Sequence, residues 1–198
     1  MESLILFKTV QFIILVILIV YISDFRKKKG MHALMNEKLI LALKLCYLIP
    51  ICIYGYVLIT LDRLLFSDFV AIIFTFFGTL LAARAKIDLG KNYTWTGYHF
   101  EAPKHVTKGV YAFIRHPLYT GLYISAFGFL STIIPHAPRL LTAVVLITLA
   151  YIMVFLALAA AREDKFLSQE FGEEFLKYQE QVHPFLPLRK FKDESIIQ

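Results

Sequence analysis

The chain has 198 residues, of which 58% are hydrophobic, with 18 Phe, 11 Tyr and a formal net charge of +6. Its mean hydropathy of +0.63 excludes an ordinary water-soluble domain and is typical of an integral membrane protein, so we expect residues 1–198 to form one membrane domain. The positive charge lies in loops, where anionic lipid headgroups account for it, and the sequence has no nucleic-acid-binding motif.

Five apolar segments are long enough, or nearly long enough, to cross a bilayer as helices of about 20 residues. In chain order they cover residues 3–22, 39–61, 67–83, 118–134 and 140–161. The first lacks the basic start and the small-residue cleavage site of a signal peptide, so we expect it to be a retained helix. The last two are expected to form a hairpin that turns at residues 135–138.

The basic residues of the loops predict the orientation of these helices. Ten basic residues lie in two loops, whereas the other two loops carry one each. The first loop has Arg26, Lys27, Lys28 and Lys29, and the third has Arg84, Lys86, Lys91, Lys104, Lys108 and Arg115; the other two have Arg63 and Arg139. Basic loops lie preferentially in the cytoplasm. We therefore expect the N-terminus outside and the C-terminus, with Arg189, Lys190 and Lys192, inside.

Cysteine and histidine spacings give no sign of a metal site, and we expect none. Cys46 and Cys52 both fall in the second segment, on differing faces, and are expected to be buried in apolar surroundings. Lys44 is almost the only polar residue inside the first three segments. It lies near the cytoplasmic end of the second segment, where a lysine can snorkel to the membrane surface.

Residues 84–117 form a polar segment that is long enough to be a lid or a pocket wall. At its end we expect Pro117 to begin the fourth helix, because proline fixes its own φ and disfavours helix at the preceding residue. Arg115 and His116 then lie just outside the helix, beside exposed amides that attract an anion. The alternative is that Arg115 is only a topology signal.

A second charged cluster, residues 162–164, lies where the fifth segment leaves the membrane. Beyond it, apolar residues recur at spacings of four, four, three and four; they are Leu167, Phe171, Phe175, Tyr178 and Val182. This spacing predicts an amphipathic helix that lies on the membrane face or folds back as a cover. A solvated helix end is the alternative for the charged cluster.

Several of these residues form an ordered series of motifs across about residues 89–188. The series is Val106, Gly109 and Tyr111; then Arg115, His116, Pro117, Tyr119 and Gly121; then Glu163 and Asp164; then Phe171, Gly172, Phe175, Tyr178, Val182 and Pro187. It resembles the C-terminal catalytic module of isoprenylcysteine carboxyl methyltransferases, a family that extends to membrane phospholipid methyltransferases. The resemblance implies a cytosolic pocket for S-adenosylmethionine that the C-terminal helix closes, and a lipid tail that enters between the helices.

We therefore expect an all-α bundle of five transmembrane helices, with residues 1–88 as scaffold and residues 89–198 as catalytic module. The resemblance places cofactor-binding residues at Pro103, Lys104, His105, Val106, Tyr111, His116, Pro117, Leu118, Tyr119 and Glu163. Glu163 is assigned to a cationic group of the cofactor. Arg115 is assigned to an anionic group of the cofactor or of the acceptor, and these two residues are the expected catalytic pair.

The sequence departs from the family at three places. Pro103 stands where relatives have a His, Asp164 stands in place of the second Glu of a Glu-Glu pair, and Ala159 stands where the eukaryotic enzymes have an Arg that contacts substrate. Arg162 is near Ala159 in sequence but lies on another helical face. The identity of the methyl acceptor therefore stays open at this point.

The expected function is methyl transfer from S-adenosylmethionine to a lipophilic acceptor, with the carboxylate of an isoprenylated cysteine favoured. A carboxylate is already ionised at neutral pH and needs no general base, whereas an amine must first lose a proton. Three alternatives remain: a phospholipid or other amine methyltransferase, a membrane reductase that uses a nicotinamide cofactor, and a scaffold without enzymatic activity. The expected partners are the lipophilic substrate and membrane lipids, and no nucleic acid.

Overall fold

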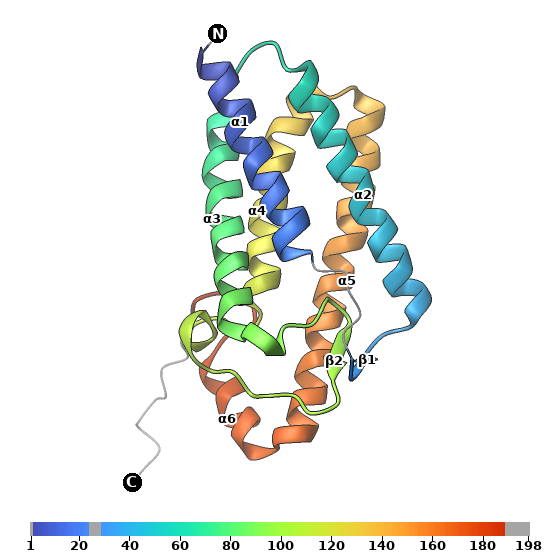
Figure 1. Cartoon of the computed structure of the whole chain (residues 1–198), viewed down its shortest axis with the longest axis vertical. Helices are drawn as coiled ribbons and strands as arrows, with labels where there is room; N and C mark the ends of the chain where they lie inside the picture. Colours follow the sequence, from blue (N-terminus) through green and yellow to red (C-terminus); the bar gives the residue numbers. More distant parts are fainter. Residues whose placement is uncertain (1, 24–28, 189–198) are drawn as a thin grey trace.

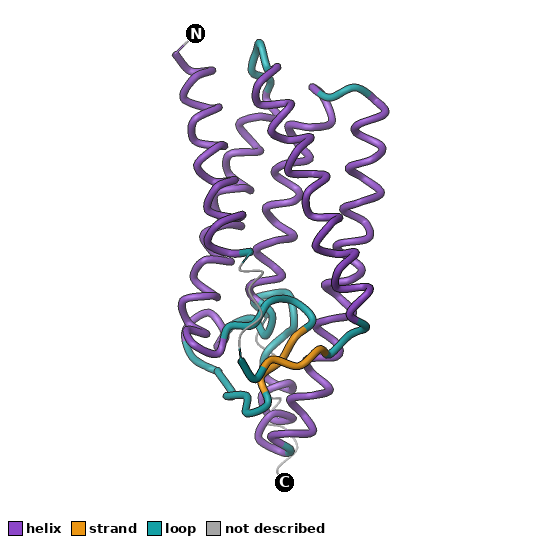
Figure 2. Tube along the Cα trace, turned by 45° about the vertical axis from the view of Figure 1, so that its right-hand side comes forward, coloured by secondary structure: helices purple, strands orange, loops and turns teal. Residues whose placement is uncertain are grey.

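The computed structural model describes residues 2–23 and 29–188. Five long helices run side by side, and a pair of short strands and a sixth helix lie at one end of the bundle (Figures 1 and 2). The helices are α1 Glu2–Val16, which a π-helical turn Ile17–Ile22 continues, α2 Glu37–Thr60, α3 Phe66–Leu89, α4 Pro117–His136, α5 Arg139–Phe171 and α6 Glu173–Gln181. The strands are β1 Met31–Ala33 and β2 Tyr98–Phe100.

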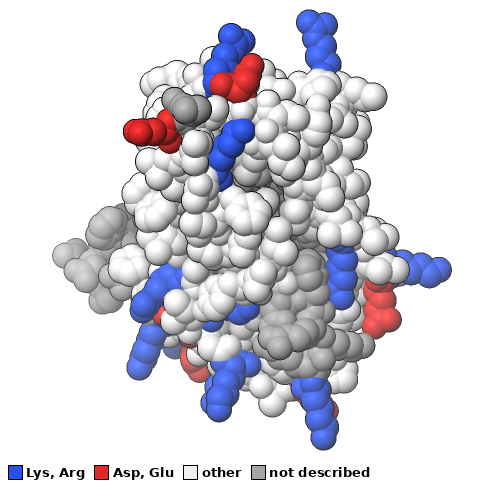
Figure 3. Space-filling model, turned by 45° about the horizontal axis from the view of Figure 1, so that its top comes forward, with Lys and Arg blue, Asp and Glu red and all other residues white. Residues whose placement is uncertain are grey.

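The five long helices are long and apolar enough to cross a membrane, as the hydropathy predicts. Their outward faces expose large apolar side chains; Ile59, Phe66 and Leu140 are all at least 75% exposed. In Figure 3 the charged side chains gather mainly toward the two ends, and a broad uncharged band separates them. Because so large an apolar surface needs a lipid environment, the molecule is a multi-pass membrane protein. The residues Arg26, Lys27, Lys28, Arg189, Lys190 and Lys192, which contributed to the orientation argument, lie outside the described residues.

The expected ends of two helices were wrong. Helix α3 continues to Leu89, and α5 has 33 residues and runs on to Phe171 instead of ending near residue 161. At 1.5 Å per residue α5 is about 50 Å long, which exceeds the roughly 30 Å hydrocarbon core. Glu163 and Asp164 therefore lie on a continuous helix that extends beyond the apolar layer.

The expected amphipathic helix across residues 167–182 is in fact two helices. Gly172, at φ 55°, ends α5 and begins α6, so Leu167 and Phe171 belong to one helix and Phe175 and Tyr178 to the other. Glycine adopts this conformation without the steric cost of a Cβ atom. The change of direction folds α6 back toward the loop that precedes α4 (Figure 1).

The fold is mostly helical, as expected, and the structure adds two short strands that the sequence did not predict. Strand β1 pairs antiparallel with β2, with Met31 opposite Phe100 and Ala33 opposite Tyr98. Leu34 extends the contact, because its backbone N–H donates to the carbonyl of Gly97 at 2.8 Å. The pairing brings the segment between α1 and α2 against the polar segment that precedes α4.

Helices α3 and α4 approach each other closely through small residues. A Cβ atom added to Gly121 would lie 2.5 Å from the carbonyl oxygen of Gly78, and one added to Gly78 would lie 2.5 Å from the amide of Ser125. Such small-residue faces let helix backbones pack in direct contact inside a membrane. This contact sets the position of the first turn of α4, which carries several of the predicted site residues.

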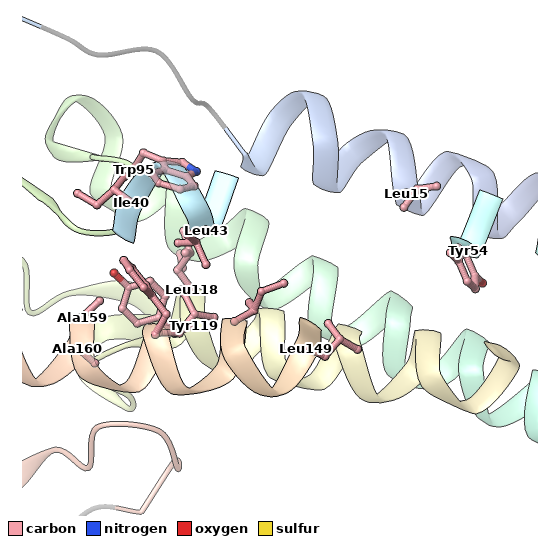
Figure 4. Packing of buried hydrophobic residues seen from close by; sticks show 14 of the residues in the cluster. Leu15, Ile40, Leu43, Tyr54, Trp95, Leu118, Tyr119, Leu149, Ala159 and Ala160 are labelled. Atoms are coloured by element: carbon pink, nitrogen blue, oxygen red, sulfur yellow. The ribbon is translucent and has the colours of Figure 1, made fainter. Parts of the chain in front are cut away.

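The buried core runs along the axis of the bundle, from Trp95 at one end to Tyr54 toward the other (Figure 4). In the same view Tyr119 of α4 and Ala159 of α5 lie close together, at the end of the core that holds Trp95. The expectation that both cysteines are buried is wrong, because Cys46 is only half-buried and Cys52 is exposed on the apolar outer face of α2.

Candidate functional site

A cavity lies at the end of the bundle where the strands and α6 gather. The empty space inside it, with its open mouth included, is about 980 Å³. Nine of the ten residues predicted to bind the cofactor line it, and Arg115 lines it as well; the nine are Pro103, Lys104, His105, Val106, Tyr111, His116, Leu118, Tyr119 and Glu163. Pro117 is buried as the first residue of α4 and is not among the lining residues.

The start of α4 has the predicted form. Pro117 is the first helical residue, and His116 precedes it with a non-helical backbone. The amides just before the helix are occupied, however, because Arg115 N–H donates to the carbonyl of His183 at 3.0 Å and His116 N–H to that of Pro184 at 2.9 Å. These two amides are therefore not available to an anion, and the segment that follows α6 is tied to the start of α4.

Four charged side chains form a compact cluster in the cavity wall. Arg115 Nη2 lies 3.3 Å from Asp164 Oδ2, and His116 Nε2 lies 3.0 Å from Asp164 Oδ1. His116 Nδ1 lies 3.5 Å from Glu163 Oε2, and the hydroxyl of Tyr119 donates to Glu163 Oε1. The side chains of Arg115 and His116 are only 11% and 6% exposed. The cluster therefore holds two anions against two cations, with little access to water.

The geometry around His116 favours its charged form. Burial lowers its pKa, but the hydrogen bonds from Asp164 and Glu163 outweigh burial and raise the pKa to about 9. Each ring nitrogen faces a carboxylate, and both must carry a proton to donate. His116 is therefore a cation at neutral pH and is not available there as a general base.

Helix α6 lies against the loop that carries Tyr111. The hydroxyl of Tyr178 donates to the carbonyl of Tyr111 at 2.6 Å, and Phe175 is almost completely buried. Burial raises the pKa of both tyrosines well above the ordinary value, so both stay neutral. That α6 closes a cofactor pocket stays a prediction, but its contacts place it at the wall of the cavity.

His105 sits in an aromatic surround formed by this helix. Its ring centroid is 5.2 Å from that of Phe175 and 5.1 Å from that of Tyr178, and its Nδ1 lies 2.9 Å from Glu174 Oε1. Within the described part of the chain, His105 Nε2 and Arg115 Nε are buried without a hydrogen-bond partner. Buried polar atoms are nearly always paired, so two unpaired nitrogens in the wall of one cavity fit a polar ligand there.

Neither Ala159, where the eukaryotic enzymes have a substrate-binding arginine, nor the nearby Arg162 places a charge in the cavity. Ala159 is fully buried, and Arg162 Nη1 donates to the carbonyl of Leu34 at 3.0 Å. Arg162 is not among the residues that line the cavity. It ties α5 to the segment beyond β1 instead.

Sequence reasoning missed some of the lining residues. Leu34 comes from the segment after the first helix, and Phe166 from the extension of α5. The pairing of β1 with β2 brings Leu34 to the cavity. No local pattern at residues 31–34 predicts that this segment pairs with a strand more than sixty residues away. Phe166 could have been found by continuing the helical spacing beyond residue 161.

Five membrane-length helices with a charged cavity at one end define a membrane protein with a candidate site for a polar small molecule. Residues 66–174, more than half of the chain, match the phospholipid methyltransferase family. Two similar proteins, from Oryza sativa subsp. indica and Oryza sativa subsp. japonica, are each described as a probable protein-S-isoprenylcysteine O-methyltransferase. Each is 30% identical to this chain over 127 residues, which is 62% of this chain and 62% of the relative.

The chain belongs to the phospholipid methyltransferase family, which confirms the family predicted from the ordered motifs. The match begins at the start of α3 and ends in α6, so it includes the whole charged cluster. The chain spans about 62% of the length of the plant relatives that it matches.

Proposed function

We propose that this protein transfers a methyl group from S-adenosylmethionine to a lipophilic acceptor, and that the acceptor is the carboxylate of an isoprenylated cysteine. The observation that supports this most is the buried cluster of Arg115, His116, Glu163 and Asp164 in the wall of a cavity next to the membrane-spanning core. S-adenosylmethionine carries an ammonium and a carboxylate on its amino acid end. A site with paired cations and anions suits such a zwitterion.

The residues that would hold the cofactor follow from their charge. Glu163 would accept from the ammonium group, and Arg115, whose Nε is unpaired, would donate to the carboxylate. His116 lies between Glu163 and Asp164 and would hold both carboxylates in place. Tyr111 and Tyr119, both buried, would form the less polar part of the wall.

When bound, the cofactor supplies an electrophilic methyl group on a sulfonium centre. The protein then has to align the acceptor with that methyl and exclude water, because opposite charges cancel in the transition state. Helix α6 and the segment after it would exclude water, since they contact the loops on both sides of Arg115. No residue has to remove a proton from a carboxylate acceptor.

The lipophilic part of the proposal is supported by a second cavity inside the bundle. The empty space inside it, with its opening included, is about 750 Å³, and it is lined almost entirely by apolar residues of α1, α2, α4 and α5, among them Leu15, Ile51, Phe129 and Leu156. A cavity of this kind suits a hydrocarbon chain. We propose that the tail of the acceptor occupies it while the reacting group enters the polar cavity.

The state of His116 favours a carboxylate acceptor over an amine. An amine must lose a proton, but His116 is already protonated at neutral pH and each acidic side chain of the cluster faces a cation. A phospholipid amine is the second candidate, and the family match favours it. A nicotinamide-dependent reductase and a scaffold without activity receive no comparable support.

We further propose that the cavity faces the cytoplasm. Lys104, Lys108 and Arg115 lie at or near the cavity end of the bundle, and basic loops lie preferentially on the cytoplasmic side. The odd number of spans then places the start of α1 on the opposite side.

The pH dependence of the methyl-transfer step distinguishes the two acceptors. With a prenylcysteine analogue, we expect the single-turnover rate to show no log-linear rise between about pH 6.5 and 9, because a carboxyl group with a pKa of about 4 is already ionised. An amine, with a pKa of about 10 in water, would give a rate that increases with pH until a base or the amine itself has titrated. A log-linear rise with transfer only to phosphatidylethanolamine would replace the carboxylate proposal by the amine proposal.

A further inference from the structure

Lys44 is a cation inside a membrane-spanning helix. It lies in α2, seven residues after the helix begins, and its side chain is half-buried. Its Nζ is 5.1 Å from the ring centroid of Trp95 and 5.9 Å from that of Tyr98. Both of these contacts are to aromatic rings. A charged group at this depth is costly and usually has a functional partner.

The two aromatic rings fix where this ammonium lies. Ring faces attract a cation, and a lysine that only snorkelled would extend toward water instead of lying against two rings. The rings compensate the charge only in part, because a ring quadrupole is weaker than an ion. Within the described residues, the two rings therefore hold a cation whose charge they compensate only in part.

Lys44 itself lines neither cavity, but its two ring partners lie beside them. Tyr98 lines the polar cavity, whereas Trp95 packs edge-on against Tyr47, which lines the apolar cavity. Tyr47 is three residues after Lys44 on the same face of α2. A molecule with its tail in the apolar cavity and its head in the polar cavity would pass this point.

The other cations near the polar cavity either bind a protein group already or lie outside the membrane-spanning helices. Arg115 pairs with Asp164, and Arg162 donates to the carbonyl of Leu34. Lys104 lines the polar cavity but belongs to a loop, not to a membrane-spanning helix. Lys44 is thus the cation placed to meet a charge that lies at the junction of tail and head.

We propose that Lys44 binds the anionic group of the lipophilic acceptor, that is, a carboxylate or a phosphate attached to a hydrocarbon chain. The inference rests on the proposed function and adds to it a residue that selects an anionic lipid. The ammonium would hold that anion where the tail leaves the apolar cavity, and this contact would fix how far the head reaches toward the charged cluster.

The test compares the binding of acids with that of their uncharged counterparts. We would measure by calorimetry, in neutral phosphatidylcholine nanodiscs, the affinity for N-acetyl-farnesylcysteine and for its methyl ester, and the affinity for a lysophosphatidylethanolamine and for a monoacylglycerol of the same chain length. In at least one pair, the wild-type protein is expected to bind the member that carries a carboxylate or a phosphate group more tightly, and the pair with the larger preference identifies the carboxylate or the phosphate. In Lys44→Met this preference is expected to fall about tenfold, and Lys44→Arg is expected to retain most of it.

The control is Lys38→Met, which removes an exposed lysine from the first turn of the same helix and should leave the preference unchanged. Affinity for S-adenosylhomocysteine reports whether each variant is folded, and Lys44→Gln takes the place of Lys44→Met if the latter does not fold. Equal preferences in the wild-type protein, Lys44→Met and Lys38→Met would overturn the inference. Absence of methyl transfer by the wild-type protein would instead refute the proposed function, because these binding measurements need no turnover.

Discussion

The Glu163→Gln protein is expected to bind S-adenosylhomocysteine about ten- to a hundred-fold more weakly than the wild-type protein, because a charge-assisted hydrogen bond contributes about 1.5–3 kcal/mol. S-adenosylhomocysteine keeps the ammonium group that we assign to Glu163. The substitution preserves the shape of the side chain, and the remaining carbonyl oxygen can still accept from the hydroxyl of Tyr119. Isothermal calorimetry of the purified protein measures the change.

Glu170→Gln is the matched control for this experiment. Glu170 lies on the same helix two turns further on, is exposed and does not line the cavity. Its substitution should leave the affinity unaltered. If Glu163→Gln also bound with wild-type affinity, Glu163 would have no part in holding the cofactor.

The stability of the wild-type protein is expected to fall as the pH rises from about 6.5 to 9, relative to that of His116→Asn. The pKa of His116 is about 9 in the folded protein and 6.5 in an unfolded chain, so protonation stabilises the folded state fully below pH 6.5 and the stabilisation is lost as the pH rises through 9. A difference of this size corresponds to roughly 3 kcal/mol in the free energy of unfolding.

Thermal unfolding in detergent at several pH values measures this effect. The difference in Tm between the wild-type protein and His116→Asn cancels the contribution of every other titrating group. That difference should shrink with increasing pH across the range. Parallel curves for the two proteins would mean that His116 is not held as a cation between Asp164 and Glu163.

Hydropathy predicted the number of long helices because membrane-spanning segments must be continuously apolar. It could not predict where α5 ends, since it marks the limit of the apolar layer and not the limit of the helix. Residues 162–171 are charged or amphipathic but have no helix breaker before Gly172. The strands β1 and β2 have three residues each and pair across more than sixty residues of chain. They are too short for an alternation of polar and apolar residues to predict them.

The predicted residues of the site could be assembled from the sequence because the motifs occur in a fixed order. Their mutual contacts could not, because Arg115 and Asp164 are separated by 49 positions and meet only when α4 packs against α5. The sequence therefore suggested Arg115 as a free anion-binding group, whereas its Nη2 pairs with Asp164 and its Nε is buried without a hydrogen-bond partner. The carbonyls that occupy the amides before α4 come from residues 183–184, which no local pattern links to that helix.

Transfer of a labelled methyl group from S-adenosylmethionine to a panel of lipophilic acceptors tests the central claim most directly. The panel contains a prenylcysteine analogue, its methyl ester and phosphatidylethanolamine, and the label is counted in the organic extract after incubation with the purified protein. We expect label in the product of the prenylcysteine acid, none with the ester, and a strong loss of label in Glu163→Gln but not in Glu170→Gln. An absence of transfer to every acceptor, from a protein that is folded by its thermal unfolding, would contradict the assignment of this chain as an S-adenosylmethionine-dependent methyltransferase of lipophilic acceptors.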